Sequence, residues 1–306
     1  TLPWSRCAVC RANTLPPMAQ YRETFSLHSR LRYSIGVSRE GVNRTGPLDG
    51  WVGGDVVGAA LVTGGARRIG AAICRALAEA GHSVAIHCHN SVEEAEALAA
   101  ELRDTGVSAV VLQAEFSDIA AVSAMVGAAA DKLGGLDILV NNASTFEYDD
   151  LESLNPETFE RTLRVNALAP LILSREFAAQ VPETGGVIVN LLDQKLANPN
   201  PDYLSYTTSK HALAGLTRSL SIGLAPSVRV NGIAPGLTLP SPHASQASFD
   251  EMHGTTPLGR GSTAEDVASA VLFLVGAKAV TGEVIHVDGG EHLAPRASDV
   301  LYGRGD

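Results

Sequence analysis

Short apolar runs alternate with longer amphipathic segments along most of the chain. The short runs have the composition of buried strands, and the longer segments carry apolar residues at helical spacing. Strands are predicted at residues 56–62, 83–87, 107–113, 136–140, 186–191, 228–233 and 283–287. Helices are predicted at residues 68–80, 92–105, 119–133, 156–181, 203–225 and 263–276. This alternation predicts a doubly wound α/β domain, with a parallel sheet and helices on both of its faces.

Three stretches of the chain lack these periods. Residues 1–55 mix Arg, Ser, Pro, Gly and Trp without a strand or helix period, so a poorly ordered extension is expected there. A small accessory module is the alternative for this segment. The domain is predicted to span residues 56–295 and to be followed by a C-terminal tail at 296–306. The polar segment 237–257 is expected to be a loop that covers the functional site.

The composition argues against several classes of protein. Of the 306 residues, 45% are hydrophobic and 18% are charged, as in ordinary globular domains. The net charge of −10 argues against binding to nucleic acid or to an anionic membrane. No apolar run reaches the ~20 residues that span a bilayer, and no signal-peptide pattern is present. The four cysteines form no disulfide pattern, which favours the cytoplasm. Cys7 and Cys10 have only His28 nearby, so no metal site is predicted.

A glycine-rich turn, Thr63–Gly70, separates the first predicted strand from the first helix. Glycine lets the backbone approach a phosphate closely, and the helix start presents free N–H groups to it. Glycines of this kind also occur in ordinary turns, but the position at the start of a βαβ series favours a dinucleotide site. The residues expected to contact the cofactor here are Gly64, Arg67, Arg68, Ile69 and Gly70.

The end of the second strand indicates which dinucleotide binds. NAD-selective folds place an acidic residue there for the ribose 2′-hydroxyl. This chain has His87-Cys88-His89-Asn90-Ser91 and no acid before Glu93. A carboxylate would repel a 2′-phosphate, and its absence permits one. Arg67, His87, Asn90 and Ser91 could supply positive charge or hydrogen-bond donors, so the cofactor is predicted to be NADP.

Tyr206 and Lys210 lie one turn apart on the same face of a predicted helix. An ammonium near the phenol lowers its pKa from ~10 towards the working range, which suits a general acid for hydride transfer. Many helices carry this spacing by chance, so the surroundings decide. Carboxyl ends of parallel strands form one rim, where ligands bind. That rim is predicted to collect Asn141–Ser144, Asp193 and Pro235-Gly236, with Asn166 in a neighbouring helix.

Residues 57–292 resemble the short-chain dehydrogenase/reductase superfamily. The matching motifs, in order, are Thr63–Gly70, Asn141-Asn142-Ala143, Asn166, Tyr206-Thr207-Thr208-Ser209-Lys210, Arg229-Val230-Asn231, Pro235-Gly236 and Val287-Asp288-Gly289-Gly290. The resemblance implies one Rossmann domain with a seven-stranded parallel sheet, usually in a homotetramer. Further cofactor contacts are expected from Glu115, Phe116, Asn142, Ala143, Ser144, Tyr206, Lys210, Pro235 and Gly236.

Two departures narrow the resemblance within that superfamily. Arg68 stands where most members have glycine, and Asp193 stands where most have serine. Pteridine reductases and the related bacterial dihydromonapterin or dihydrofolate reductases are similar at both places. Their His-x-His-Arg-Ser strand end is also similar, although Asn90 here replaces the arginine and weakens the predicted hold on the 2′-phosphate. Phe146 matches the aromatic residue that stacks on the pterin; a plain pocket or core phenylalanine is the alternative.

The resemblance implies hydride transfer from NADPH to a C=N bond of a pterin or dihydrofolate. Tyr206 would supply the proton, Lys210 would lower its pKa and bind the nicotinamide ribose, and Asn166 would hold a water chain. Asp193 would orient Tyr206 or hydrogen-bond the substrate. Burial should raise the pKa of Asp193 and Lys210 should lower it, and the sequence leaves the balance open. The expected substrate contacts are Arg68, Ser144, Phe146, Asp193 and Tyr206.

Two other functions remain open from the sequence. A carbonyl reductase for a sugar, steroid or acyl-thioester ketone would use the same Tyr206 and Lys210. Asp193 argues against it, because a carboxylate beside a developing alkoxide is unfavourable unless it is protonated. A catalytically silent NADP-binding sensor would have no need of Tyr206, Lys210 and Asn166. In each case the expected partner is a small molecule, such as a pterin, folate or ketone.

Overall fold

The computed structural model describes residues 58–240 and 246–294. Their seven strands form one sheet in which every neighbouring pair is parallel. The strand order is β3-β2-β1-β4-β5-β6-β7. The strands are β1 (Ala59–Val62), β2 (Ser83–Cys88), β3 (Ala109–Gln113), β4 (Ile138–Asn141), β5 (Gly186–Leu191), β6 (Val228–Pro235) and β7 (Val284–Val287). The predicted seven-stranded parallel sheet is confirmed.

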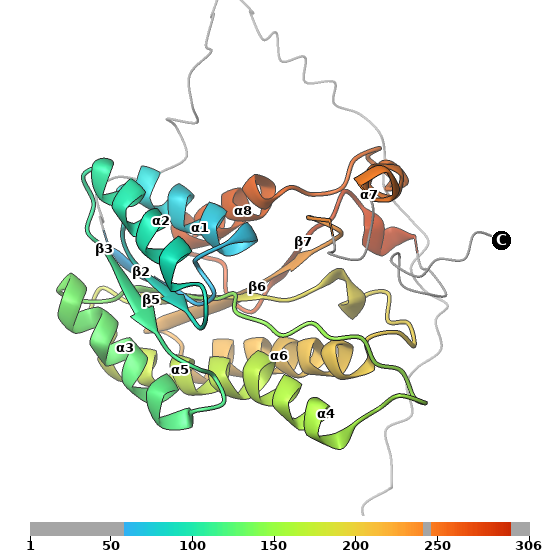
Figure 1. Cartoon of the computed structure of the whole chain (residues 1–306). Helices are drawn as coiled ribbons and strands as arrows, with labels where there is room; N and C mark the ends of the chain where they lie inside the picture. The colour runs from blue at the N-terminus through green and yellow to red at the C-terminus, as the bar shows by residue number, and fades with distance from the viewer. Residues whose placement is uncertain (1–57, 241–245, 295–306) are drawn as a thin grey trace, which may run out of the picture. The chain divides into compact units, whose positions relative to one another are not determined.

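Helices cover both faces of this sheet (Figure 1). One face carries α1 (Arg68–Glu79), α2 (Val92–Asp104) and α8 (Ala264–Gly276), and the other carries α3 (Ile119–Leu133), α5 (Ala169–Gln180) and α6 (Leu204–Gly223). Alternate residues of a strand point to opposite faces. Ala60 and Val62 of β1 therefore enter the core under α1, α2 and α8, whereas Ala59 and Leu61 enter the core under α3 and α5.

The order of the strands reverses between β1 and β4. From β1 the chain adds β2 and β3 on one side, and from β4 it adds β5, β6 and β7 on the other. The crossover helices leave a crevice beyond the carboxyl ends of the two central strands, where doubly wound proteins bind ligands. The glycine-rich turn follows β1 and the Asn142-Ala143 segment follows β4, so both lie at this point.

Two helical segments differ from the prediction. The single helix expected at 156–181 is α4 (Pro156–Leu163), a π-helical turn η1 (Arg164–Leu168) and α5. The segment 237–257, predicted to be a loop, contains α7 (Gln246–Gly254), so the prediction is wrong there. The sequence of α7 is mostly polar and gives no apolar stripe from which a helix could be predicted.

The remaining elements are the short 3-10 helices η2 (Gln194–Leu196) and η3 (Glu291–Leu293). The predicted N-terminal extension at 1–55 and C-terminal tail at 296–306 lie outside the described residues. Within 58–240 and 246–294, no helix has both the length and the apolar content needed to cross a membrane.

Candidate active site

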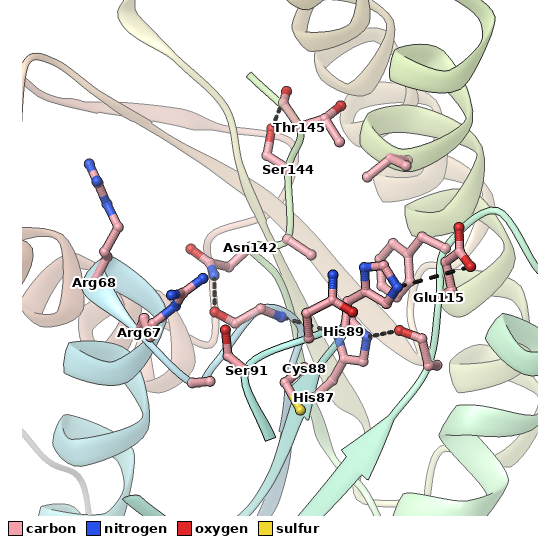
Figure 2. Close-up of a pocket in the computed structure, with 18 of the residues that line it drawn as sticks. Arg67, Arg68, His87, Cys88, His89, Ser91, Glu115, Asn142, Ser144 and Thr145 are labelled. Atoms are coloured by element: carbon pink, nitrogen blue, oxygen red, sulfur yellow. Dashed lines mark hydrogen bonds and ion pairs between the residues drawn. The ribbon is translucent and has the colours of Figure 1, made fainter. Parts of the chain in front are cut away.

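A pocket of about 550 Å³ opens beyond the carboxyl ends of β1, β2, β3 and β4. Figure 2 shows Arg67 and Arg68 on one side of it, Glu115 on another, and Ser144 with Thr145 on a third. The lining brings together thirteen residues that the sequence assigns to the cofactor: Gly64, Arg67, Arg68, Ile69, Gly70, His87, Asn90, Ser91, Glu115, Phe116, Asn142, Ala143 and Ser144. Residues from 64 to 144 therefore converge on one cavity.

Two glycines of the first turn are required by its geometry. Gly64 has a φ of +61°, in the left-handed region that glycine adopts without a steric cost. Gly70 lies against the turn itself, because a Cβ there would be 2.2 Å from the carbonyl oxygen of Gly64. The same Cβ would be 2.7 Å from Asn142 Nδ2. A side chain at residue 70 would therefore push α1 away from the turn and from Asn142.

Thr63 and Asn142 join the ends of β1 and β4. The Thr63 hydroxyl oxygen accepts hydrogen bonds from the N–H groups of Asn142 (2.9 Å) and Ala143 (3.0 Å). In return, Asn142 Nδ2 donates to the carbonyl oxygens of Thr63 (2.8 Å) and Gly64 (3.1 Å). This reciprocal set holds the two sides of the crevice together and explains why the Asn-Asn-Ala motif occurs with a Thr-Gly turn.

His87, near the end of β2, is a neutral residue that joins the loops after β1 and β3. Its Nδ1 accepts from the Gly64 N–H (3.1 Å), so Nε2 carries the proton and donates to the Ala114 carbonyl oxygen (3.2 Å). The ring stacks on Phe116 with centroids 4.5 Å apart. Burial lowers the pKa of His87 to about 4. His87 lines the pocket, but the suggestion that it supplies positive charge is wrong, because both nitrogens have partners in the uncharged ring.

Arg67 and Arg68 provide the positive charge beside the turn. The Arg67 guanidinium lies 3.5 Å from Glu94 Oε1, and both side chains are about half exposed or more (63% and 49%). Arg68 begins α1 with a φ of 56°, an uncommon value for a residue with a side chain. Ser91 precedes α2 and makes no side-chain cap there, which leaves its hydroxyl available to a ligand.

The catalytic candidates form a second group, in which Tyr206 and Lys210 are buried and Asp193 is partly buried. The Tyr206 hydroxyl donates to Asp193 Oδ2 (2.7 Å), and Asp193 Oδ1 accepts from the Lys195 N–H (2.8 Å). The Lys210 ammonium donates to the Leu191 carbonyl oxygen (2.7 Å) and lies 5.5 Å from the centroid of the Tyr206 ring. Helix α6 therefore places Tyr206 and Lys210 beside the end of β5, as their spacing predicts.

The charges of this group are strongly affected by burial. Burial raises the pKa of the Asp193 carboxyl above its ordinary value, although the Lys195 N–H, the Tyr206 hydroxyl and the Lys210 ammonium act against this shift. Burial also lowers the pKa of Lys210 to about 8, and the nearby Asp193 opposes that change. The sequence left open whether burial or Lys210 dominates the pKa of Asp193. Burial dominates, so Asp193 holds a proton more readily than an ordinary aspartate.

Asn166 links the catalytic helix to the loop that follows β4. It sits in the π-helical turn η1, a local widening of the helix that often occurs at functional sites. Its Oδ1 accepts from the Thr145 N–H (2.8 Å), and its Nδ2 donates to the Thr145 carbonyl (3.0 Å) and to Ser209 Oγ (2.9 Å). Thr145 also lines the pocket, so Asn166 connects the pocket to the helix of Tyr206 and Lys210.

Phe146 lies against Tyr206, the candidate proton donor. Its ring is half exposed (47%) and meets the Tyr206 ring edge-on, with centroids 4.6 Å apart. On one side it stacks on Tyr203 at 4.1 Å, with an angle of 12° between the planes. A half-exposed ring beside the reacting group favours a ligand-contacting phenylalanine over a core residue.

Comparison with known proteins decides the family. The short-chain dehydrogenase/reductase family model described as Enoyl-(Acyl carrier protein) reductase matches residues 64–292, which is most of the chain. The chain belongs to the short-chain dehydrogenase/reductase family. The matched range contains residues 64–70 of the glycine-rich turn, the Thr63 partner Asn142, and the Tyr206 and Lys210 pair.

Several members of the short-chain dehydrogenase/reductase family are similar over nearly their whole length. Pteridine reductase 1 of Leishmania tarentolae is 36% identical, with 76% of this chain and 96% of that protein covered. The crystal structure of FolM alternative dihydrofolate reductase 1 from Brucella suis in complex with NADP has a TM-score of 0.75 at 40% identity, with 78% and 96% covered. The 3-oxoacyl-[acyl-carrier-protein] reductase FabG of Staphylococcus aureus is 33% identical over 76% and 98%.

Some family positions lie outside the pocket, and some lining residues were not predicted. Pro235 ends β6 and Gly236 bonds to Val287, at the same rim as β5 but not in the pocket wall. The sequence did not single out these lining residues: Ala66, Cys88, His89, Ala114, Ser117, Thr145, Arg161 and Val165. Most adjoin a predicted residue in the chain, whereas Arg161 and Val165 reach the pocket from α4 and η1, where no motif marks them.

Proposed function

We propose that this protein is an NADPH-dependent reductase that reduces a C=N bond of a pterin or dihydrofolate. The observation that carries the proposal is the Asp193–Tyr206 hydrogen bond of 2.7 Å beside the half-exposed ring of Phe146. The pterin ring system is flat and presents N–H and amino groups. A phenyl ring can stack on it, and a carboxyl group can accept its hydrogen bonds. The similarity to a pteridine reductase and to a FolM dihydrofolate reductase supports this substrate class.

The residues at the switch point fit a dinucleotide. The glycines at 64 and 70 let the start of α1 pack closely on the turn beside the pocket, where free N–H groups of a helix start can bind a pyrophosphate. Arg67, Asn90 and Ser91 would hold the 2′-phosphate, and Lys210 would bind the nicotinamide ribose. The similar Brucella structure, which contains NADP, supports the same choice. When bound, NADPH supplies the hydride.

The protein's own residues would supply the proton and orient the substrate. Tyr206 Oη is the acid that faces the reacting nitrogen, and Asp193 can return a proton to it across their 2.7 Å hydrogen bond. The raised pKa of Asp193 favours this relay, because a carboxyl that is easier to protonate can more readily carry the proton that it passes to Tyr206. The buried Lys210 ammonium favours the tyrosinate that remains.

A second candidate is reduction of a ketone, which the similarity to FabG supports. The raised pKa of Asp193 weakens the argument against ketone reduction, because a carboxyl that is easier to protonate repels a developing alkoxide less. A screen of NADPH oxidation with dihydropterins, dihydrofolate and simple ketones separates the two candidates. We expect dihydropterins or dihydrofolate to give the highest kcat/KM, and a higher value for a ketone would replace the proposal. A protein that binds NADPH but reduces none of them would be the sensor.

We further propose that the enzyme is a homotetramer in the cytoplasm. Membership of the family supports the homotetramer. The free, buried thiols of Cys74 and Cys88 are compatible with a reducing compartment such as the cytoplasm. Light scattering of the purified protein tests the tetramer, with a monomer or dimer as the contrary result. Fractionation of the source cells tests the location.

A further inference from the structure

The loop after β4 contains a buried carboxylate that the proposed mechanism does not use. Asp149 is only 3% exposed and lies three residues after Phe146. Buried carboxylates are costly unless hydrogen bonds compensate for the lost hydration. The partners of Asp149 therefore indicate what the side chain does.

All of the partners lie at the start of the catalytic helix α6. The carboxylate accepts from the Ser205 N–H (3.0 Å to Oδ1 and 3.2 Å to Oδ2) and from the Ser205 hydroxyl. The carbonyl oxygen of Asp149 also accepts from the Leu204 N–H (3.2 Å). Residues 56 positions away in the sequence are thus joined by several bonds.

Helix α6 uses this distant carboxylate as its N-terminal cap. The residue in the cap position, Tyr203, has a left-handed φ of 58° and makes no side-chain cap. The first N–H groups of a helix need acceptors, and a negative charge there is favourable for the helix dipole. Asp149 supplies both the acceptor and the charge.

The same loop touches the same helix a second time through aromatic rings. Phe146 stacks on Tyr203 and meets Tyr206 edge-on. Tyr148 also meets the Tyr203 ring edge-on, with centroids 5.3 Å apart. The Asp149 cap and the Phe146 stack therefore fix one short loop segment against residues 203–206.

We propose that Asp149 is a positioning residue that holds Phe146 in place relative to Tyr206 and thereby sets the affinity for the substrate ring. This role rests on the proposed function, since it takes Phe146 as the stacking partner of the pterin. Loss of the cap would leave Phe146 free to move away from Tyr206. Binding of the pterin would weaken, while the cofactor pocket, whose lining does not include Asp149, would keep its affinity.

Asp150 provides a matched control in the same loop. Its carboxylate accepts from the N–H groups of Ser153 (2.8 Å) and Glu152 (3.1 Å) and from the Ser153 hydroxyl (2.7 Å), all within the loop. Its Oδ2 also accepts from the hydroxyl of Tyr148 (3.2 Å), whose ring meets Tyr203. Asp150→Asn therefore removes the same charge one position along while leaving every hydrogen bond between Asp149 and α6 in place. Ser205→Ala removes one partner of Asp149 and introduces a good helix former, so this variant should fold even if Asp149→Ala does not.

The experiment compares Asp149→Asn, Asp149→Ala, Ser205→Ala and Asp150→Asn with the parent. For each variant it measures KM and kcat for a dihydropterin and the Kd of NADPH. It also measures the Kd of oxidised biopterin for the NADP⁺-loaded enzyme, from the quenching of biopterin fluorescence. We expect KM and the biopterin Kd to rise about tenfold in Asp149→Ala and about threefold in Asp149→Asn and Ser205→Ala, as weakened charge-assisted hydrogen bonds imply. NADPH binding and the Asp150→Asn variant should stay within about twofold of the parent.

Two results would overturn the role of Asp149. One is a biopterin Kd that does not change in Asp149→Asn and Ser205→Ala. The other is a parallel loss of NADPH affinity in both variants, which would mean that the cap only maintains the fold. A parent enzyme that does not bind biopterin and reduces neither a dihydropterin nor dihydrofolate would refute the proposed function itself, and the role of Asp149 with it. A parent that binds biopterin and reduces either substrate, with Asp149 variants that match it, refutes only the role of Asp149.

Discussion

Asp193 Oδ2 accepts a hydrogen bond from the Tyr206 hydroxyl (2.7 Å), in a site where burial raises the pKa of the Asp193 carboxyl and lowers the pKa of the nearby Lys210 ammonium. Desolvation thus shifts the pKa values of the two groups beside the Tyr206 phenol in opposite directions. Asp193 is made easier to protonate and Lys210 easier to deprotonate than they are in water. Tyr206 can exchange a proton with Asp193 while the ammonium limits the cost of its anion.

Removing the phenol hydroxyl should abolish turnover without emptying the cofactor pocket. In Tyr206→Phe, we expect kcat to fall by about 10²- to 10⁴-fold, the usual contribution of a positioned acid. The Kd of NADPH should stay close to the parent value, because the hydroxyl is needed only when the proton moves. Lys210→Ala should impair both quantities, since Lys210 would also bind the nicotinamide ribose in the proposed mechanism. Stopped-flow turnover and NADPH fluorescence titration measure them, and near-normal turnover of Tyr206→Phe would identify a different acid.

The rate should fall at alkaline pH as Lys210 loses its charge. The pKa of about 8 predicts that kcat declines above that pH, with Lys210→Arg shifting the decline upwards because a guanidinium stays charged. Because Lys210 and Asp193 interact, the apparent pKa of this decline in kcat describes the titration of the pair rather than of either group alone. A pH–rate profile at saturating NADPH checks this expectation. A profile that is flat to pH 9.5 in the parent would contradict it.

Stability has the opposite dependence on pH in this range. The folded pKa of Lys210 is about 8, whereas an unfolded lysine titrates near 10.4, so between these values the unfolded chain binds more protons. The free energy of unfolding contributed by Lys210 therefore rises as the pH increases from about 8 to about 10.4. Lys210→Met should lose this slope when urea unfolding is compared at pH 7.5 and 9.5. An equal slope in the parent and in Lys210→Met would show that other groups cause it.

Cofactor preference should depend on Arg67 and on its partner Glu94. Arg67→Ala should weaken NADPH by about three- to tenfold and leave NADH nearly unchanged, because only NADPH carries the 2′-phosphate. Glu94→Gln should strengthen NADPH binding, since it frees the Arg67 guanidinium that now lies 3.5 Å from Glu94 Oε1. Asn90→Asp should favour NADH by repulsion. Fluorescence titrations at low and high salt test all three, and a parent that prefers NADH would contradict the assignment.

Most of the fold could be predicted because its determinants are local. The apolar runs at 83–87 and 186–191 correspond to β2 and β5, and the helix at 119–133 corresponds to α3. The order of the strands was not predicted, because periodicity does not specify which strands pair. Helix α7 was missed because its polar sequence gives no stripe, and the widened turn at Asn166 has no sequence signal.

The site could be predicted only where a motif marks it. The spacing of Tyr206 and Lys210 and the position of Asp193 after a strand predicted their meeting correctly. The contacts between Asp149 and Ser205, and between Phe146 and Tyr203, join distant positions that no motif relates. The charge of His87 was misjudged for a similar reason. Its burial and its stacking on Phe116 are tertiary properties that a strand-end histidine does not reveal.

The central claim is that Asp193 adapts the tyrosine–lysine site to a C=N bond, and exchange of this residue tests it most directly. Asp193→Ser introduces the residue that most members of the family carry, and Asp193→Asn keeps the shape but cannot titrate. The measurement is the ratio of kcat/KM for a dihydropterin to that for a simple ketone, with the Kd of NADPH as the control.

We predict that the ratio falls by at least about tenfold in both variants, the lower bound for loss of a proton-relaying group, while NADPH binds as in the parent. A serine variant that reduces dihydropterins as well as the parent would contradict the account.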